Sequence, residues 1–306
     1  MSYTLLVVGS LNMDLVVPVD HHPTPGETVL GSDLQMYAGG KGANQAVAAA
    51  LAGGKVSLLG CLGEDDFGQR LQANLIAQGV NTAHLFTTGI PTGVALITVD
   101  RRGENMIVVS PGANHHLTPD RFSLDYLEGV GLVMLQLEIP LSTVEAVVKA
   151  AQARQIPLLL NPAPVQPLSA TLLSQIDYLV LNESEAAFLG GQPVTSPATA
   201  LQVAKRLRQL GSRTVIITLG GAGLVWQTSS DQGYLAAHPV EVVDTTAAGD
   251  SFCGAFAVSL LEGHPLHQAL AFANAAAALT VTQKGSQPSL PHRQQIDDFL
   301  ADPADY

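Results

Sequence analysis

Residues 178–219 read YLVLNESEAAFLGGQPVTSPATALQVAKRLRQLGSRTVIITL, and this stretch decides the fold class. Its two ends, Tyr178–Leu181 and Thr214–Leu219, are short and apolar throughout, which is typical of strands buried on both faces. Between them, Pro197–Leu210 has the composition of a helix. A strand, a helix and a second buried strand in this order favour a parallel pair, because the helix supplies the crossover. The stretch therefore predicts a parallel sheet covered by helices.

The same alternation of short apolar runs and longer Ala/Leu-rich segments continues along most of the chain of 306 residues. We therefore predict an α/β fold that is doubly wound, with a mostly parallel central sheet and helices on both faces. The further strands are Leu5–Gly9, Val56–Leu62, Leu132–Leu137 and Ile156–Leu160, and the further helices lie near Gly42–Gly53, Phe67–Gln78, Leu141–Arg154, Gly249–Glu262 and Pro265–Thr282.

Short alternating segments joined by Pro, Gly or charged turns interrupt this pattern, and no helix separates the members of each pair. They predict a small antiparallel β-sheet that serves as a lid. The segments are Asp14–Asp20, Thr28–Tyr37, Thr92–Val99 and Asn105–Val109, with a turn at Asp100–Gly103. The predicted large α/β domain, which binds nucleotide and substrate, comprises residues 1–11, 39–90 and 111–306, and the lid comprises residues 12–38 and 91–110.

Composition narrows the class of function. The formal net charge is −12, which disfavours nucleic acid and anionic membrane surfaces as partners. Apolar runs such as Ala46–Ala52 are too short to span a bilayer. A secretory signal has a basic stretch before its apolar run, and no such stretch precedes Leu5–Gly9. Cys61 and Cys253 stand among apolar or small residues and are interpreted as buried reduced thiols. We expect a cytoplasmic protein.

Ligands of open parallel sheets bind beyond the carboxyl ends of the strands. Asn12 and Asp14 follow the first strand and suit a polyhydroxy ligand, although such residues also serve as turns or caps. The run Gly39-Gly40-Lys41-Gly42-Ala43-Asn44 opens a helix, where glycines admit a ligand close to the backbone or simply form a turn. Neither G-x-x-x-x-G-K-[ST] nor G-x-G-x-x-G occurs, so nucleotide binding must depend on other residues.

The segment Asp244–Phe252, DTTAAGDSF, opens a long helix with small residues. Free N–H groups and the positive end of the helix dipole suit an anion there, such as a phosphoryl group in transfer. Asp250 either caps the helix or accepts a proton from an attacking hydroxyl. Three other strand ends offer polar or glycine-rich groups, each with an ordinary turn or cap as the alternative: Glu138, Asn182-Glu183-Ser184-Glu185 and Thr218-Leu219-Gly220-Gly221-Ala222-Gly223.

Taken together, these residues resemble the ribokinase-type (PfkB-type) carbohydrate kinase family from about Leu5 to Leu300. Both family motifs are present, the first at Gly39–Asn44 with Gly53 and Gly63 following, the second at Asp244–Phe256. Asn161-Pro162-Ala163-Pro164 adds to the likeness. The resemblance implies transfer of the ATP γ-phosphoryl group to O5 of a small sugar, with D-ribose the leading substrate, together with Mg²⁺, a monovalent cation such as K⁺, and a homodimer formed through the lids.

The resemblance also implies roles for individual residues. Asp250 would be the base, with Ala247, Ala248 and Gly249 offering N–H groups to the phosphoryl group. The sugar pocket would comprise Asn12, Asp14, Gly40, Lys41, Asn44, Glu138 and Asp250. The nucleotide would contact Asn182, Thr218, Gly220, Gly221, Gly223, Gly249 and Asn274. Mg²⁺ would be held, through water, by Asn182 and Glu185, and K⁺ by Asp244, Thr246, Thr280, Gln283, Gly285 and Ser289.

Three positions depart from commoner forms of the family: Leu181, where many members have Pro, and Thr246 and Gln283 in the cation set. Backbone carbonyls would still bind a cation at the last two. A kinase for 2-deoxyribose, fructose or a nucleoside stays open, as does a non-catalytic sugar sensor, although a sensor has no need of Asp250. A dehydrogenase is less favoured, because the dinucleotide fingerprint is absent.

Overall fold

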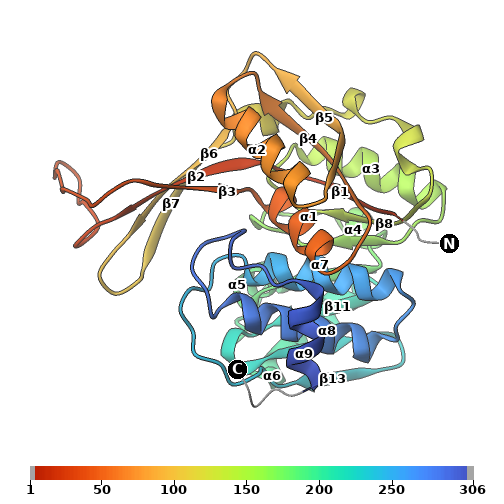
Figure 1. Cartoon of the computed structure of the whole chain (residues 1–306). Coiled ribbons are helices and arrows are strands. Elements are labelled where there is room, and N and C mark those ends of the chain that lie inside the picture. The colour runs from red at the N-terminus through yellow and green to blue at the C-terminus, as the bar shows by residue number, and fades with distance from the viewer. Residues whose placement is uncertain (1–3, 302–306) are drawn as a thin grey trace.

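The structure is a computed structural model and describes residues 4–301. Within this range the main sheet has nine strands, in the spatial order β13-β12-β11-β10-β9-β8-β1-β4-β5 (Figure 1). The strands are β1 (Thr4–Val8), β4 (Val56–Gly63), β5 (Asn81–Thr88), β8 (Val130–Leu135), β9 (Leu158–Leu160), β10 (Tyr178–Leu181), β11 (Thr214–Thr218), β12 (Leu224–Gln227) and β13 (Gln232–Leu235). All neighbouring pairs are parallel except β11–β12 and β12–β13.

Helices cover both faces of this sheet. The α-helices are α1 (Lys41–Leu51), α2 (Asp66–Ala77), α3 (Leu141–Ala153), α4 (Ala170–Leu173), α5 (Glu183–Gly190), α6 (Pro197–Gln209), α7 (Ala248–Leu261), α8 (Leu266–Thr280) and α9 (Arg293–Ala301). Short 3-10 helices are η1 (Gly112–His116), η2 (Pro119–Arg121), η3 (Leu124–Leu127) and η4 (Gly220–Ala222).

Alternation along β1 divides the core in two. Leu5 and Val7 pack with α1, α2, α7, α8 and α9 on one face, whereas Leu6 and Val8 pack with α3, α4, α5 and α6 on the other. Successive strand residues point to opposite faces, so a strand that is apolar throughout must be covered on both sides. The predicted doubly wound α/β fold is confirmed, and every predicted strand and helix of the large domain lies within two residues of its observed bounds.

The strands β5, β12 and β13 were not predicted. β12 and β13 form an antiparallel edge, in which β12 is mostly buried and β13 alternates between exposed and partly buried residues. Cys61 and Cys253 are free and buried, as predicted. None of the helices described between residues 4 and 301 is long and apolar enough to cross a membrane.

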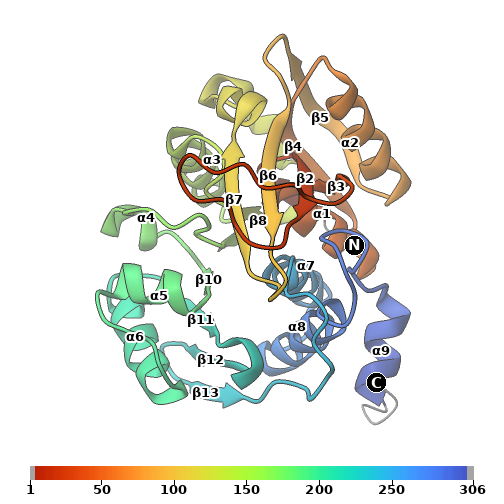
Figure 2. The same cartoon turned by 90° about the vertical axis from the view of Figure 1, so that its left-hand side faces the viewer.

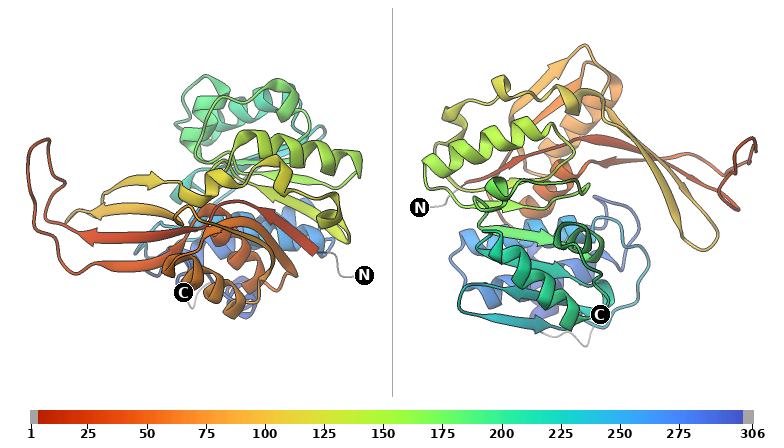
Figure 3. Two further views of the ribbon diagram at one scale, coloured as in Figure 1. Left: turned by 90° about the horizontal axis from the view of Figure 1, so that it is seen from above. Right: turned by 180° about the vertical axis from the view of Figure 1, so that it is seen from behind.

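The predicted lid is a separate sheet in the order β3-β2-β6-β7, which extends away from the main body (Figures 1 and 3). Its strands are β2 (Asn12–Pro18), β3 (Gln35–Gly39), β6 (Gly93–Val99) and β7 (Asn105–Ser110). Its outer pairs, β2–β3 and β6–β7, are antiparallel as predicted, whereas its central pair, β2–β6, is parallel. Both strands leave the main sheet from the carboxyl ends of parallel strands, β1 and β5, and therefore run outward in the same direction before each returns. In Figure 2 the lid points toward the viewer.

The predicted strand at Thr28–Tyr37 is also shorter than expected. Pairing between β2 and β3 begins only at Gln35, and the preceding chain makes one further ladder-like bond, from the Ser32 N–H to the Pro18 carbonyl. Leu30 is 91% exposed, so alternation of side chains alone did not create a strand there. A strand needs a neighbour to accept its backbone hydrogen bonds. The predicted domain boundaries stay a prediction.

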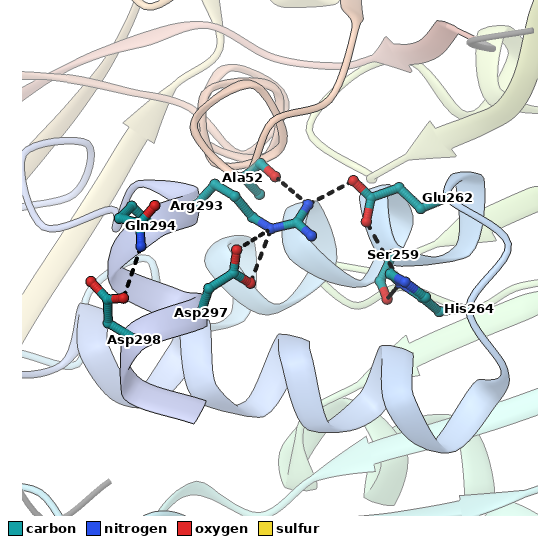
Figure 4. A network of polar contacts seen from close by, with 8 residues as sticks. All are labelled: Ala52, Ser259, Glu262, His264, Arg293, Gln294, Asp297 and Asp298. Atoms are coloured by element: carbon teal, nitrogen blue, oxygen red, sulfur yellow. Dashed lines mark hydrogen bonds and ion pairs between the residues drawn. The ribbon is translucent and has the colours of Figure 1, made fainter. Parts of the chain in front are cut away.

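Arg293, at the start of α9, bonds to residues just after the C-terminal ends of α1 and α7 (Figure 4). Its guanidinium lies 2.6 Å from the Glu262 carboxylate just after α7, donates to the Ala52 carbonyl just after α1 at 3.4 Å, and pairs with Asp297 at 2.9 Å. The same group lies over the Phe272 ring of α8, 4.9 Å from its centroid. The opposite ends of α1 and α7 carry the candidate active site.

Candidate active site

The entrance of α1 is fitted tightly against the end of β1. Gly40 has a φ of 89°, and a Cβ there would lie 2.6 Å from the Asn12 nitrogen. A Cβ on Gly42 would lie 2.5 Å from the Gly9 carbonyl carbon and the Ser10 nitrogen. Only glycine permits both the left-handed conformation and this approach. The fit brings the first turn of α1 beside the first turn of α7.

Asp250 lies where these two helix entrances meet. Its carboxylate accepts hydrogen bonds from Asn44 Nδ2 at 3.1 Å and from Gln45 Nε2 at 2.9 Å, and the residue is only 6% exposed. Gly254 allows the close approach of α7 to α1, since a Cβ there would lie 2.7 Å from the Ala48 Cβ. A buried polar group needs such hydrogen-bond partners.

The backbone before Asp250 turns sharply. Ala247 has a φ of 61°, a left-handed conformation that a non-glycine residue rarely adopts. The N–H of Ala248 donates to the Thr245 carbonyl at 3.3 Å, whereas Gly249 is exposed and a Cβ there would meet no atom within 4 Å. The first turn of a helix has N–H groups without intrahelical partners. The α7 entrance therefore presents donors beside the Asp250 carboxylate.

Predicted sugar-binding residues gather next to Asp250. Glu138, after β8, accepts hydrogen bonds from Ser10 Oγ at 2.5 Å, the Lys41 N–H at 3.3 Å and Asn12 Nδ2 at 3.4 Å. Asn114 in η1 donates to Asn12 Oδ1 at 2.7 Å and so fixes the Asn12 amide. Groups that follow β1 and β8, together with groups of β2 and α1, thus surround one polar spot.

The charges at this spot influence one another. Burial raises the pKa of Asp14 to about 7, with the nearby Glu138 and Asp250 carboxylates adding to the effect and the hydrogen bond from Ser286 opposing it. Burial acts to lower the pKa of Lys41, but the nearby carboxylates of Asp250 and Glu138 outweigh it and raise the pKa above its ordinary value. These carboxylates therefore stabilise the positive charge of Lys41.

A cavity of about 330 Å³ lies on the other side of the α7 entrance, and Ala248 and Gly249 form part of its wall. The structure brings six of the seven predicted nucleotide-contacting residues to its lining, and Asn182 is not among them; the six are Thr218, Gly220, Gly221, Gly223, Gly249 and Asn274. Its other side was not predicted; it is mostly apolar and includes His238, Val240, Val242, Phe252 and Val281. Phe252 lies in the segment Asp244–Phe252, but no signal in the sequence marks the three valines, because apolar side chains are common throughout the chain.

Asn182 and Glu185 form a capping box at the start of α5. The Asn182 side chain accepts from the Glu185 N–H at 2.8 Å, and the Glu185 carboxylate accepts from the Asn182 N–H and Nδ2 at 2.9 Å. Burial raises the pKa of Glu185, and the Asp250 charge acts in the same direction. Among residues 4–301, no three His, Cys, Asp or Glu side chains come together as a metal-binding group.

The predicted cation residues come from two segments, 244–246 and 280–289, which lie side by side. Asp244 accepts hydrogen bonds from the Thr246 hydroxyl at 2.6 Å and from the Thr246 and Gly285 N–H groups, both at 2.9 Å. Burial acts to raise the pKa of Asp244, but these bonds hold it below its usual value. The Thr280 hydroxyl is fully buried and bonds Ser251 Oγ at 2.8 Å, so its side chain belongs to helix packing. Ser289 Oγ donates to the Ser286 carbonyl, and Gln283 is exposed.

Several polar residues at the site were not predicted. Ser286 Oγ donates to Asp14 at 3.3 Å, and Gln287 Nε2 donates to Asn44 Oδ1 at 3.1 Å, so the segment after α8 contacts the sugar side directly. Gln45, which bonds Asp250, and Gln136, which bonds Gln45, are completely buried. A glutamine inside the apolar run Leu132–Leu137 is the one signal that the sequence offered, because buried amides require partners.

Comparisons with known proteins agree with this geometry. A profile of the pfkB family carbohydrate kinases matches residues 3–293. The chain is 42% identical to the ribokinase of Bacillus subtilis over 300 residues, which cover 97% of this chain and 99% of that protein. It is 35% identical to the deoxyribokinase of Salmonella typhi over 302 residues, or 97% of this chain and 98% of that protein.

The structure of Arabidopsis thaliana ribokinase complexed with ribose and ATP superposes with a TM-score of 0.91 at 35% identity, covering 98% of this chain and 99% of that one. This chain therefore belongs to the pfkB family of carbohydrate kinases. Within the family it shares more residues with the Bacillus subtilis ribokinase than with the deoxyribokinase, 42% against 35%.

Proposed function

We propose that this chain transfers the γ-phosphoryl group of ATP to O5 of D-ribose, giving D-ribose 5-phosphate and ADP. The observation that carries the proposal is the place of Asp250, between a polar spot rich in hydroxyl-binding groups and a cavity with apolar walls. Asn12, Asp14, Lys41 and Glu138 suit a small polyhydroxy acceptor, and the cavity beyond Gly249 suits a nucleotide.

In the proposed reaction the sugar O5 attacks the γ-phosphorus while its proton passes to the Asp250 carboxylate. The O5–phosphorus bond forms, the bond to the bridging oxygen of ADP breaks, and ADP leaves. The N–H groups at the α7 entrance lie beside Asp250, where they would stabilise the charge on the phosphoryl oxygens. Because no covalent enzyme intermediate forms, catalysis depends on position and electrostatics.

Two ions complete the proposal. Mg²⁺ neutralises phosphate charge, and Asn182 and Glu185 would hold it through water, which agrees with the buried carboxylate of Glu185 near Lys41 and Asp250. K⁺ would bind between the segments 244–246 and 280–289, using Asp244 and backbone carbonyls. Because Asp244 already bonds to Gly285, a cation there would stiffen the loop that leads to Asp250.

We further propose a homodimer formed through the lids. Pairing registers place Met36, Leu15, Leu96 and Val108 in one row across the lid, and Asp14 on the opposite face. Met36, Leu96 and Val108 are 46%, 52% and 66% exposed. A row of exposed apolar side chains favours a second copy as its cover. The proposed location is the cytoplasm, where ATP is supplied and thiols such as Cys61 stay reduced.

The test is an ADP-release assay with ATP and Mg²⁺ that compares ribose, 2-deoxyribose, fructose and adenosine, each in K⁺ or Na⁺. Ribose should give the highest kcat/KM, with a requirement for K⁺, and the product should carry its phosphate on O5 by phosphorus NMR. Asp250→Asn keeps the size of the side chain and should lower kcat by about 10²–10⁴-fold. Preference for another acceptor would replace the substrate, and ribose binding without any turnover would favour a sensor.

A further inference from the structure

A buried group of amides lies behind Asp250, on the side away from the cavity. Gln45 and Gln136 are both 0% exposed, so neither side chain can touch a substrate. Gln45 nevertheless donates to Asp250 Oδ1 at 2.9 Å. The bond to the Asp250 carboxylate is therefore a route by which Gln45 can influence the reaction.

Every polar group of the Gln45 side chain has a partner. Its Oε1 accepts from Gln136 Nε2 at 2.6 Å, and its Nε2 donates to Asn161 Oδ1 at 3.2 Å as well as to Asp250. An amide oxygen only accepts and an amide nitrogen only donates, so these partners permit a single orientation of the Gln45 amide. That orientation directs an N–H at Asp250.

The two partners of Gln45 are themselves fixed by the main sheet. Gln136 follows β8 directly, and Asn161 follows β9 and donates to the Val180 carbonyl of β10 at 3.0 Å. Three neighbouring strands thus determine the direction in which the Gln45 amide points. This accounts for Asn161, the first residue of the Asn161–Pro164 run, which the proposed reaction leaves without a role.

The Gln136 side chain has one buried polar atom, Oε1, without a hydrogen-bond partner among the protein groups of residues 4–301. A Cβ on Gly9 would lie 2.0 Å from this oxygen, so β1 also has to leave room for it. An unpaired buried acceptor typically costs about 1–3 kcal/mol, whereas leucine or methionine would avoid that cost. A role in packing alone does not account for a glutamine here.

The two carboxylate oxygens of Asp250 differ in their surroundings. Oδ1 faces the buried Gln45, and Oδ2 accepts from Asn44, which belongs to the proposed sugar pocket. We propose that Gln45, oriented by Gln136 and Asn161, is a positioning residue that holds Oδ1 so that Oδ2 receives the proton of the sugar hydroxyl. This inference rests on the proposed kinase function.

The first variant is Gln45→Met, which keeps the length of the side chain and removes both amide groups. We expect kcat to fall about 10–100-fold, because a displaced base is no longer aligned with the hydroxyl. The dissociation constants for ribose and for a non-hydrolysable ATP analogue, measured by calorimetry, should change less than about threefold, since Gln45 touches neither ligand. Gln152→Met is the matched control, because Gln152 bonds the Gln175 carbonyl on the far side of the sheet; its kcat should equal that of the parent.

The decisive measurement is a double-mutant cycle with Asp250→Asn. If Gln45 acts only through Asp250, Gln45→Met should leave the residual turnover of Asp250→Asn unchanged. A further drop of the same size as in the parent, or a tenfold loss of ligand affinity, would show a structural role and overturn the proposal, as would an unchanged kcat in folded Gln45→Met. Gln136→Met, which leaves Gln45 in place, should lower kcat about 3–10-fold and supplies the test if Gln45→Met does not fold. An inactive parent would instead refute the kinase function itself.

Discussion

Asp14→Asn should make the protein more stable and less able to bind ribose. Asp14 lies on the lid strand β2 facing the site, where burial raises its pKa to about 7. Asparagine has the same size and can still accept the hydrogen bond that Ser286 Oγ donates to Asp14. The substitution therefore removes a buried charge and leaves the packing unchanged.

The size of the gain follows from the two pKa values. The Asp14 pKa is about 7 in the folded protein and 3.8 for an unperturbed aspartate. Each unit of difference between the two pKa values corresponds to about 1.4 kcal/mol of unfolding free energy. The folded state holds the proton more tightly than the unfolded chain, so this group lowers stability as the pH rises from about 4 to about 7. Above pH 7 its full cost is roughly 4 kcal/mol, and near pH 4 the cost approaches zero.

Urea denaturation at several pH values between about 4 and 9 measures how this cost to the free energy of unfolding changes with pH. The free energy of unfolding of Asp14→Asn should exceed that of the parent by about 2–4 kcal/mol at pH 9, and the difference should shrink steadily below pH 7. Asp33→Asn, at an exposed position between β2 and β3, should show no such difference. A difference in unfolding free energy between parent and Asp14→Asn that is independent of pH would show that the Asp14 charge is not its cause. KM for ribose should rise about 10–100-fold, because the amide loses one charged acceptor.

Arg293→Met should lower the free energy of unfolding by about 1–2 kcal/mol, a value kept small because the side chain is 35% exposed and its ion pairs with Glu262 and Asp297 are screened. Calorimetric melting would measure this, with Gln294→Met on the same helix as the control; an equal loss in both variants would contradict a specific role of the guanidinium. Val108→Asp should convert the proposed dimer to a monomer in sedimentation velocity while the monomer stays folded by circular dichroism, since the side chain is 66% exposed in the single chain. A dimer that persists in Val108→Asp would place the interface elsewhere.

Local pattern was sufficient for most of the fold and part of the site. Strands such as Leu5–Gly9 were predictable because burial on both faces leaves a continuous apolar run, and the α7 entrance was predictable because small residues before a long helix stand out. The lid was predicted as a sheet, but the parallel pairing at its centre was not. Alternation shows which residues are strands, but it does not show which strand lies beside which, and β2 and β6 are parallel.

The α/β class, the glycine entrance at Gly40 and the candidate base Asp250 were predictable from the sequence, since each depends on residues close together in the chain. The surroundings of Asp250 were not, because they depend on the tertiary structure. Gln45 meets Gln136 across 91 positions and Asn161 across 116, and Asp250 across 205. The amide partners of a buried glutamine and the apolar wall of a cavity depend on which strands and helices become neighbours. The spacing of apolar residues along the sequence indicates single helices and strands, but it does not indicate which of them become neighbours in the folded chain.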